Sequence, residues 1–226
     1  MIIGNGLLAS AFKDRYAKAT AVTIFASGVS NSTEANESEF LREKNLLLTS
    51  LENKNSRLVY FSTCSVLDQT LAIQPYTKHK LEMENIVQQS QKYAIFRLSQ
   101  VVGKTTNPHT LTNFLYTKIK NCQTFQVWER ATRNLIDIRD VSLAVDFFLT
   151  NYGNNLNLNL AAPESVPVLK IVKIFEQITS QKAQFDLLDK GAKIEIAVPE
   201  LMRHERKIGL SFSADYVERI LRKYYS

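Results

Sequence analysis

Short apolar segments alternate with helix-like stretches along the first part of the chain. The segments that resemble strands are residues 1–3, 21–26, 57–62 and 93–98. The stretches after them carry hydrophobic residues at helical spacing, beginning near residues 7, 40, 75 and 110. Such alternation is typical of a parallel sheet that is covered by helices on both faces and joined by right-handed crossovers. The pattern therefore predicts an α/β fold with a Rossmann-like parallel sheet.

The second half of the chain is less regular and predicts a small additional lobe. The residues expected to cap three of its helices are Asp140, Ser165 and Ser213. We expect the Rossmann-like, dinucleotide-binding core to comprise residues 1–108 and 134–160. Residues 109–133 and 161–226 are expected to form a small C-terminal lobe that binds the substrate.

The composition predicts a folded cytoplasmic protein. Of the 226 residues, 45% are hydrophobic and 22% are charged, which is enough for a sizeable core. No apolar run reaches the roughly 18 residues of a membrane span, and the N-terminus lacks the pattern of a signal peptide. Two cysteines, Cys64 and Cys122, and three scattered histidines indicate neither a disulfide framework nor a metal site. Most basic residues behind the net charge of +6 are dispersed, so we expect no nucleic-acid partner, whereas a small phosphorylated substrate stays open.

A glycine-containing turn directly follows the first strand. Residues 4–9 have the sequence Gly-Asn-Gly-Leu-Leu-Ala, which fits the pattern GxGxxG/A, and a helix is expected to begin there. Glycines at these positions let the backbone approach a pyrophosphate, and the helix N-terminus offers unpaired N–H groups. The context indicates a dinucleotide site, and a plain tight turn is the alternative.

A second motif, YxxxK, is formed by Tyr76 and Lys80 on a helix that begins near Pro75. A spacing of four residues places both side chains on one helical face. A lysine about 4 Å from a phenol, at an effective dielectric near 20, stabilises the phenolate by roughly 4 kcal/mol, or about three pKa units. Lys80 is therefore expected to lower the pKa of Tyr76 towards neutrality, so that the phenol exchanges a proton with a carbonyl or alcohol oxygen during hydride transfer. An exposed tyrosine beside a helical lysine is the alternative.

The strand over residues 57–62 ends in a run of hydroxyl-bearing residues, Ser62, Thr63 and Ser65. Ligands of open α/β sheets bind beyond the carboxyl ends of the strands. A hydroxyl in this run can therefore hydrogen-bond the same substrate oxygen that Tyr76 protonates. Ordinary turn capping by serine and threonine is the alternative.

Taken in order, these motifs resemble those of the extended short-chain dehydrogenases, that is, the NAD-dependent epimerase/dehydratase and dTDP-4-dehydrorhamnose reductase group. The resemblance covers most of the chain. The segments that carry it are the cofactor turn at residues 4–9, the strand end at 25–27, Asn45 in the following helix, the serine/threonine segment at 61–66, the tyrosine and lysine at 75–80, and the segments 96–103 and 133–141.

The resemblance implies an NAD(P)-dependent oxidoreductase or epimerase that acts by hydride transfer on a nucleotide sugar. The reaction would be 4-keto reduction or epimerisation in polysaccharide biosynthesis, and a homodimer is the expected oligomeric state. The implied catalytic residues are Thr63 as the hydrogen-bond donor to the carbonyl, Tyr76 as the acid/base, and Lys80 as its tuner and the ribose anchor. The residues implied to bind the cofactor, NAD or NADP, are Gly4, Asn5, Gly6, Leu7, Leu8, Ala9, Ala26, Ser27, Ser62, Tyr76 and Lys80. The residues implied to bind the substrate are Ser65, Asn107 and Arg133, with Arg133 at the place of an arginine that often meets substrate phosphate.

Two features depart from the family pattern. Two strands that normally lie between the first helix and the strand ending at Phe25 are missing, together with the residue that selects NAD or NADP. We therefore expect a sheet that lacks two strands of its first half. The stretch from Thr63 to Tyr76 is also shorter than usual. The missing strands support the rival hypothesis, a non-catalytic Rossmann-like protein that binds a dinucleotide or a partner and has a regulatory role. The intact set of Thr63, Tyr76 and Lys80 opposes it, because a pure binding module has no need of a tuned phenol.

Overall fold

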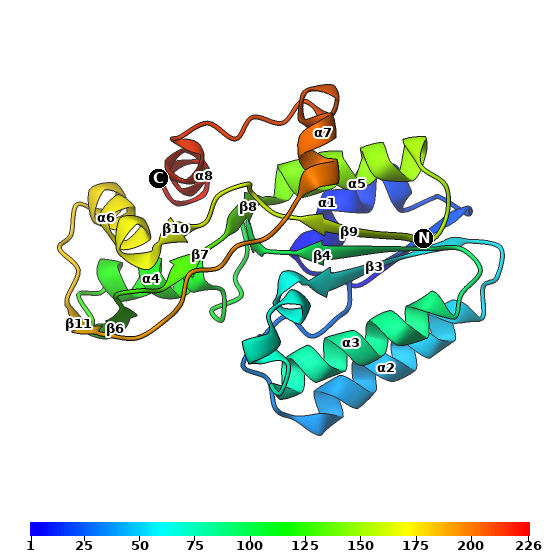
Figure 1. Cartoon of the computed structure of the whole chain (residues 1–226), viewed down its shortest axis with the longest axis horizontal. Coiled ribbons are helices and arrows are strands. Elements are labelled where there is room, and N and C mark those ends of the chain that lie inside the picture. The colour runs from blue at the N-terminus through cyan, green and yellow to red at the C-terminus, as the bar shows by residue number, and fades with distance from the viewer. The chain divides into compact units, whose positions relative to one another are not determined.

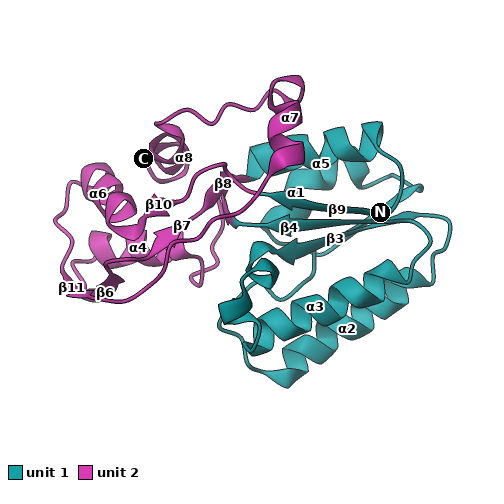
Figure 2. Ribbon diagram, in the orientation of Figure 1, with its two compact units in different colours: residues 1–99, 138–160 teal, residues 100–137, 161–226 magenta.

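The computed structural model describes residues 1–226 and divides into two compact units (Figure 2). The first unit comprises Met1–Ser99 and Ile138–Leu160, and the second comprises Gln100–Asp137 and Ala161–Ser226. The chain thus crosses from one unit to the other three times.

The first unit contains a sheet of five parallel strands in the order β1-β2-β3-β4-β9. The strands are β1 (Ile2–Ile3), β2 (Val22–Phe25), β3 (Arg57–Thr63), β4 (Tyr93–Leu98) and β9 (Leu156–Leu160). Because β1 pairs directly with β2 and forms one edge, the sheet has no strands where the first half of a complete Rossmann sheet would continue. This confirms the predicted fold class, including the two absent strands.

Two pairs of helices cover the two faces of this sheet (Figure 1). The helices are α1 (Leu7–Tyr16) and α5 (Ile138–Asn151) on one face, and α2 (Glu37–Leu51) and α3 (Pro75–Gln88) on the other. The central strand β3 is buried along residues 57–62, as expected for a parallel strand with helices on both sides. Its alternate residues face opposite layers: Tyr60 packs in the cluster with α2 and α3, whereas Phe61 stacks on Phe12 of α1 with ring centroids 5.4 Å apart.

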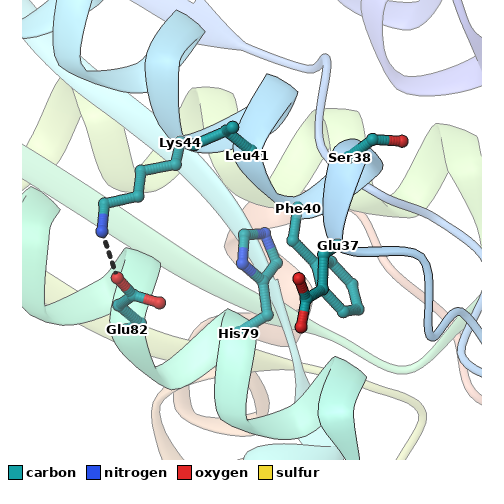
Figure 3. A pocket seen from close by; sticks show the side chains of 7 residues that line it. All are labelled: Glu37, Ser38, Phe40, Leu41, Lys44, His79 and Glu82. Atoms are coloured by element: carbon teal, nitrogen blue, oxygen red, sulfur yellow. Dashed lines mark hydrogen bonds and ion pairs between the residues drawn. The ribbon is translucent and has the colours of Figure 1, made fainter.

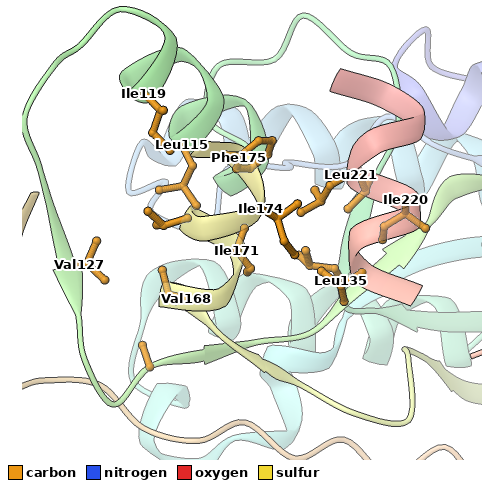
Figure 4. Packing of buried hydrophobic residues seen from close by; sticks show 14 of the residues in the cluster. Leu115, Ile119, Val127, Leu135, Val168, Ile171, Ile174, Phe175, Ile220 and Leu221 are labelled. Atoms are coloured by element: carbon orange, nitrogen blue, oxygen red, sulfur yellow. The ribbon is translucent and has the colours of Figure 1, made fainter. Parts of the chain in front are cut away.

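Helices also pack against short strand pairs in the second unit. Its elements are β5 (Gln100–Val102), α4 (Leu111–Lys120), β6 (Phe125–Trp128), β7 (Thr132–Arg133), β8 (Leu135–Asp137), β10 (Val166–Pro167), α6 (Val168–Thr179), β11 (Phe185–Leu188), α7 (Pro199–Ile208) and α8 (Tyr216–Tyr225). The pairs are β5 with β8, β6 with β11, and β7 with β10. Figure 4 shows the apolar core that α4, α6 and α8 share, with Leu115, Phe175 and Leu221 fully buried in it.

Two sets of predicted boundaries differ from the structure. The segments 100–108 and 134–137 belong to the second unit rather than to the Rossmann-like core, because β5 and β8 pair with each other and not with the five-stranded sheet. The three predicted N-caps are also wrong. Asp140 lies inside the first turn of α5, and the cap positions of α6 and α8 are Pro167 and Asp215 instead of Ser165 and Ser213.

None of the helices is long and apolar enough to cross a membrane.

Candidate active site

The turn between β1 and α1 packs tightly against the end of β2. Gly4 has a φ of +123°, and a Cβ built on it would lie 2.3 Å from the carbonyl oxygen of Ala26. Only glycine adopts this backbone conformation without strain, and only glycine leaves room for the carbonyl. The first glycine of the motif therefore joins two neighbouring strand ends at the carboxyl edge of the sheet.

The other residues of the glycine motif form the start of α1. Gly6 is the N-cap residue and supplies no side-chain cap, Leu7 and Leu8 begin the helix, and Ala9 is buried beneath it. A Cβ built on Gly6 would meet no atom within 4 Å, and Gly4, Asn5 and Gly6 are exposed. The first N–H groups of a helix have no intrahelical partner and attract anions. The turn therefore fits the pyrophosphate of a dinucleotide.

Thr63 and Tyr76 meet at the carboxyl end of β3. Thr63 is the last residue of β3, and its hydroxyl accepts a hydrogen bond from the Ser65 N–H at 3.2 Å. Thr63 lies close enough to Tyr76 for its hydroxyl to lower the pKa of the phenol, while that hydroxyl donates its own hydrogen bond to Ser65. Tyr76 is the second residue of α3, directly after Pro75 at the first helical position, and it is buried. The two predicted catalytic hydroxyl groups are thus brought together by a strand end and a helix start.

Lys80 lies one helical turn after Tyr76, but its ammonium group is already paired. Its Nζ atom is 2.9 and 3.2 Å from the two carboxylate oxygens of Glu43 and 3.2 Å from the hydroxyl of Tyr60. The same Nζ atom lies 5.7 Å from the centre of the Tyr76 ring. Lys80 is 2% exposed and Glu43 is fully buried. The lysine therefore stands beside the phenol as half of a buried ion pair rather than as a free cation.

Glu43 is the centre of this buried polar cluster. Its carboxylate accepts hydrogen bonds from the Tyr60 hydroxyl at 2.6 Å, from the Val29 N–H at 2.6 Å and from His79 Nε2 at 3.0 Å, besides those from Lys80. Since a carboxylate only accepts, Nε2 of His79 carries the hydrogen. Burial raises the pKa of Glu43, but Lys80 and the hydrogen bonds outweigh burial and hold that pKa at about 2. Glu43 is therefore ionised over the whole physiological pH range.

A glycine makes room for the ion pair in the loop after β2. A Cβ built on Gly28 would lie 2.7 Å from Nζ of Lys80 and 3.0 Å from Oε1 of Glu43. The adjacent Val29 supplies the backbone N–H that Glu43 accepts. The loop therefore packs closely against the ion pair. It can do so because residue 28 is a glycine and has no side chain.

The electrostatics at Tyr76 run opposite to the prediction from sequence. Burial raises the pKa of Tyr76, and the Glu43 carboxylate raises it further, whereas the Thr63 hydroxyl lowers it. The net direction is upwards, so Tyr76 is a protonated phenol at neutral pH. The expectation that Lys80 lowers the pKa of Tyr76 towards neutrality was wrong because it omitted the burial of the phenol, which is the larger cause, and the Glu43 carboxylate that neutralises the lysine.

Sequence reasoning missed Glu43, Tyr60 and His79. One signal was present: Glu43 interrupts the buried stripe of α2, four residues before the buried Leu47. A carboxylate in such a stripe needs a buried partner. Asn45, the residue of this helix that the family resemblance singled out, is exposed.

The remaining predicted site residues lie in different surroundings. Ser62 on β3 has a buried hydroxyl without a hydrogen-bond partner, which leaves a polar group available near the strand end. The carbonyl of Ser27, next to Ala26, accepts a hydrogen bond from Arg42 at 3.2 Å. Ser65 lies beside Thr63 and accepts a hydrogen bond from its hydroxyl at 3.2 Å.

Asn107 and Arg133 belong to the second unit. Asn107 lies in the turn before α4, where its side-chain oxygen accepts the N–H of His109 at 2.9 Å. Arg133 lies on β7, where its Nη1 donates to the Thr132 carbonyl at 2.8 Å. Arg133 forms no ion pair, and burial lowers the pKa of its guanidinium group. This leaves a half-buried guanidinium with no carboxylate of its own.

A shallow hollow between α2 and α3 is separate from these catalytic candidates (Figure 3). It measures about 460 Å³ and is lined by Glu37, Ser38, Phe40, Leu41, Lys44, His79 and Glu82. Phe40 stacks on the His79 ring with centroids 4.5 Å apart, and Lys44 pairs with Glu82 at 2.6 Å. The hollow contains none of Thr63, Tyr76 and Lys80, so we do not assign it as the site of chemistry.

Solved structures with the same fold are similar to almost the whole chain. UDP-glucose 4-epimerase from Thermus thermophilus, in complex with NAD, is 15% identical with a TM-score of 0.70, and the match covers 95% of this chain and 78% of that one. UDP-N-acetylglucosamine 4-epimerase from Methanobrevibacter ruminantium, in complex with UDP-N-acetylmuramic acid, is 16% identical with a TM-score of 0.72, over 100% and 81% of the two chains. The protein RMD from Pseudomonas aeruginosa, complexed with NADPH, is 15% identical with a TM-score of 0.69, over 97% and 86%. At these identities the similarity establishes the fold.

Family membership comes from the sequence itself. No curated protein sequence matches the chain significantly. The family model of the NAD dependent epimerase/dehydratase family matches residues 5–161, which is more than half of the chain and includes the glycine turn from Asn5 onwards, Thr63, Tyr76 and Lys80. The chain therefore belongs to the NAD dependent epimerase/dehydratase family.

Proposed function

We propose that this protein catalyses hydride transfer on a nucleotide sugar, either as a 4-keto reductase or as an epimerase. The observation that carries the proposal is the proximity of Thr63 and Tyr76 at the carboxyl end of β3, in the same unit as the glycine turn. Ligands of open α/β sheets bind at this edge. A buried phenol with a second hydroxyl beside it is suited to exchanging a proton with a substrate oxygen.

Each of the two hydroxyl groups then has one role in the chemistry. Tyr76 exchanges the proton with the substrate oxygen, and Thr63 hydrogen-bonds the same oxygen. Lys80 lies one helical turn from Tyr76, but Glu43 and Tyr60 take up its ammonium donors, so we do not assign it the ribose-anchor role that the family resemblance implied. A nicotinamide dinucleotide, NAD or NADP, supplies or accepts the hydride when it is bound.

The glycine turn and the neighbouring strand ends form the proposed cofactor side. Its residues are Gly4, Asn5, Gly6, Leu7, Leu8, Ala9, Ala26, Ser27 and Ser62. On the substrate side we propose Ser65, Asn107 and Arg133. The guanidinium group of Arg133, which has no carboxylate partner, is suited to a substrate phosphate. An unchanged Michaelis constant for a nucleotide sugar in Arg133→Ala would contradict that assignment.

The test of the catalytic assignment is Tyr76→Phe, which removes only the hydroxyl group. We expect turnover to fall by a factor of at least about 10³, because no other group replaces the proton donor. Cofactor affinity, measured by calorimetry, should change less than about threefold. The matched control is Tyr93→Phe at the start of β4, which removes a tyrosine hydroxyl outside the site and should leave turnover unchanged.

Turnover of Tyr76→Phe within a few fold of the parent would show that Tyr76 is not the acid/base. A parent protein that binds a dinucleotide but turns over no sugar nucleotide would favour the non-catalytic, regulatory alternative. A mass-spectrometric inventory of nucleotides that copurify with the protein is the first step, since it names the substrate class to assay.

We also propose a cytoplasmic homodimer that acts in polysaccharide biosynthesis. Both cysteines are free, which fits a reducing compartment. Leu41 and Leu48 lie two helical turns apart on α2 and are 57% and 45% exposed, an apolar stripe that suits a second copy of the chain. A monomeric mass in light scattering at micromolar concentration would exclude the dimer.

A further inference from the structure

The buried cluster around Glu43 carries an inference about the direction of the reaction. We infer that Glu43 is a positioning residue, which holds Lys80 as a neutral buried ion pair so that Tyr76 acts as a proton donor and the site reduces a carbonyl group. This inference rests on the proposed function and deepens it, because reduction and epimerisation place opposite demands on Tyr76.

The first step of the argument is the completeness of the ion pair. Nζ of Lys80 contacts both carboxylate oxygens of Glu43, at 2.9 and 3.2 Å, and the Tyr60 hydroxyl at 3.2 Å. Glu43 in turn accepts from three further groups, on the loop after β2, on β3 and on α3 itself, so it cannot turn away from Lys80 without leaving buried donors unpaired. The lysine charge is therefore compensated permanently in this fold.

The second step is the fit of the surrounding loop. The space above the pair is closed by Gly28, where any side chain would collide with Nζ of Lys80. A pair held this closely keeps Lys80 in one position. The charged or titratable groups that face the cluster are Arg42 and Glu43 from α2, Tyr60 from β3, and Tyr76, His79, Lys80 and Glu84 from α3.

The third step is what each reaction needs from Tyr76. In carbonyl reduction the carbon receives a hydride with its electron pair, the C=O π pair moves to oxygen, and that oxygen takes the Tyr76 proton. Solvent then returns a proton to the phenolate, and the reduced nicotinamide dinucleotide of this family is the hydride source. Epimerisation of an alcohol begins instead with removal of a hydroxyl proton, which needs Tyr76 as a phenolate. A phenol beside a lysine whose charge is compensated can donate a proton in reduction, but it is not in the phenolate state with which epimerisation begins.

The experiment follows the ionisation of Tyr76 directly, in protein without cofactor or substrate. Tyrosine is labelled with ¹³C at Cζ, and the Tyr76 signal is assigned by its loss in Tyr76→Phe. In the parent we expect Tyr76 to stay protonated while exposed tyrosines ionise near their ordinary pKa of about 10. In Glu43→Gln the negative neighbour is gone, and the Tyr76 pKa should fall by about one unit or more.

Two variants separate charge from structure. Glu82→Gln removes a carboxylate of α3 that is paired with Lys44 and is not among the groups that face the cluster, and it should leave the Tyr76 titration unchanged. Glu43→Asp keeps the charge and should restore the high pKa. If Glu43→Gln does not fold, Lys80→Met is compared with the double variant Lys80→Met/Glu43→Gln, and the Tyr76 pKa should be lower in the double variant.

A Tyr76 that ionises at its ordinary pKa in the parent, or equally in the parent and in Glu43→Gln, would overturn the inference. Once a substrate is known, the pH profile of alcohol oxidation in Glu43→Gln should shift to lower pH by as much as the Tyr76 pKa falls. An unshifted profile would also overturn the inference. Because the titration needs neither cofactor nor turnover, its failure is distinct from failure of the proposed function, which the Tyr76→Phe assay reports.

Discussion

At the scale of single residues, the site combines groups that sequence identifies with groups that only folding brings together. Thr63, Tyr76 and Lys80 stand in recognisable motifs. Glu43 does not, yet it decides the charge state around Lys80. A buried ion pair of this kind costs desolvation for both partners, and it is maintained because its remaining hydrogen-bonding groups are satisfied.

The first prediction at this scale concerns acid stability. The pKa of Glu43 in the fold is about 2, against an ordinary value of 4.5. A lowered carboxyl pKa contributes stability that is present above pH 4.5 and is lost as the pH falls towards 2. Taken alone, this difference corresponds to about 3 kcal/mol of unfolding free energy at neutral pH, and burial of Lys80, which lowers the pKa of that lysine, offsets part of it.

Urea unfolding of the parent at pH 7, 4.5, 3.5 and 2.5 measures this loss, which we expect between the last three values. Lys80→Met/Glu43→Gln, which removes both charges, should lose clearly less over the same interval. A control substitution of the exposed Glu52 by Gln should leave the parent behaviour unchanged. Equal losses in the parent and the double variant would contradict the assigned role of Glu43.

At the scale of elements, strands with strong local signals were predicted well and long-range pairs were not. The strand predicted over residues 93–98 coincides with β4, and the helix expected to begin at residue 7 is α1. The strands β6 and β11 were missed because their partners are far apart in the chain, and short strands are recognisable mainly by their pairing. The helix α7 was missed too, although Pro199 begins it and Gly209 ends it.

The prediction at this scale contrasts two glycines of one turn. Gly4→Ala should lower the unfolding free energy by about 1–3 kcal/mol or more, because its φ is positive and its Cβ would meet the Ala26 carbonyl. Gly6→Ala should cost less, about 0.5–1 kcal/mol for the poorer N-cap residue, since its conformation is extended and the space around it is open.

The same pair separates folding from binding. Gly6→Ala and the larger Gly6→Val should weaken dinucleotide affinity in calorimetry, because a side chain there obstructs approach of phosphates to the helix N-terminus. Denaturant unfolding of Gly4→Ala and Gly6→Ala measures the effect of each substitution on stability. Equal stability of Gly4→Ala and Gly6→Ala would show that the contact with Ala26 does not constrain the turn.

At the scale of the whole molecule, the sheet of the first unit is a shortened Rossmann sheet with β1 at its edge. In a complete sheet, the strand after the first helix carries the side chain that grips the adenosine ribose. Here that strand is missing. The next strand in the chain, β2, pairs with the other edge of β1. We therefore expect the glycine turn to provide most of the hold on a dinucleotide.

The prediction at this scale is modest cofactor affinity with weak selectivity. Calorimetric titration should give dissociation constants for NAD and NADP in the micromolar range and within about tenfold of each other, that is, within about 1.4 kcal/mol. Both should weaken strongly in Gly6→Val. Tight binding of one cofactor with exclusion of the other would mean that a different segment rebuilds the adenosine site.

The fold class, the glycine turn, the order of the motifs and the pair formed by Thr63 and Tyr76 could all be predicted from the sequence. They depend on local rules: strand and helix periodicity, the backbone freedom of glycine, and the meeting of parallel strands at one edge. The pKa direction at Tyr76 could not be predicted in this way. It depends first on the burial of the phenol and then on Glu43. Glu43 lies 37 positions from Lys80 in the chain and meets it only when α2 packs against α3. Local patterns therefore determined which groups take part, whereas tertiary packing decided their charge, because burial and compensation of a charge depend on neighbours that are distant in sequence.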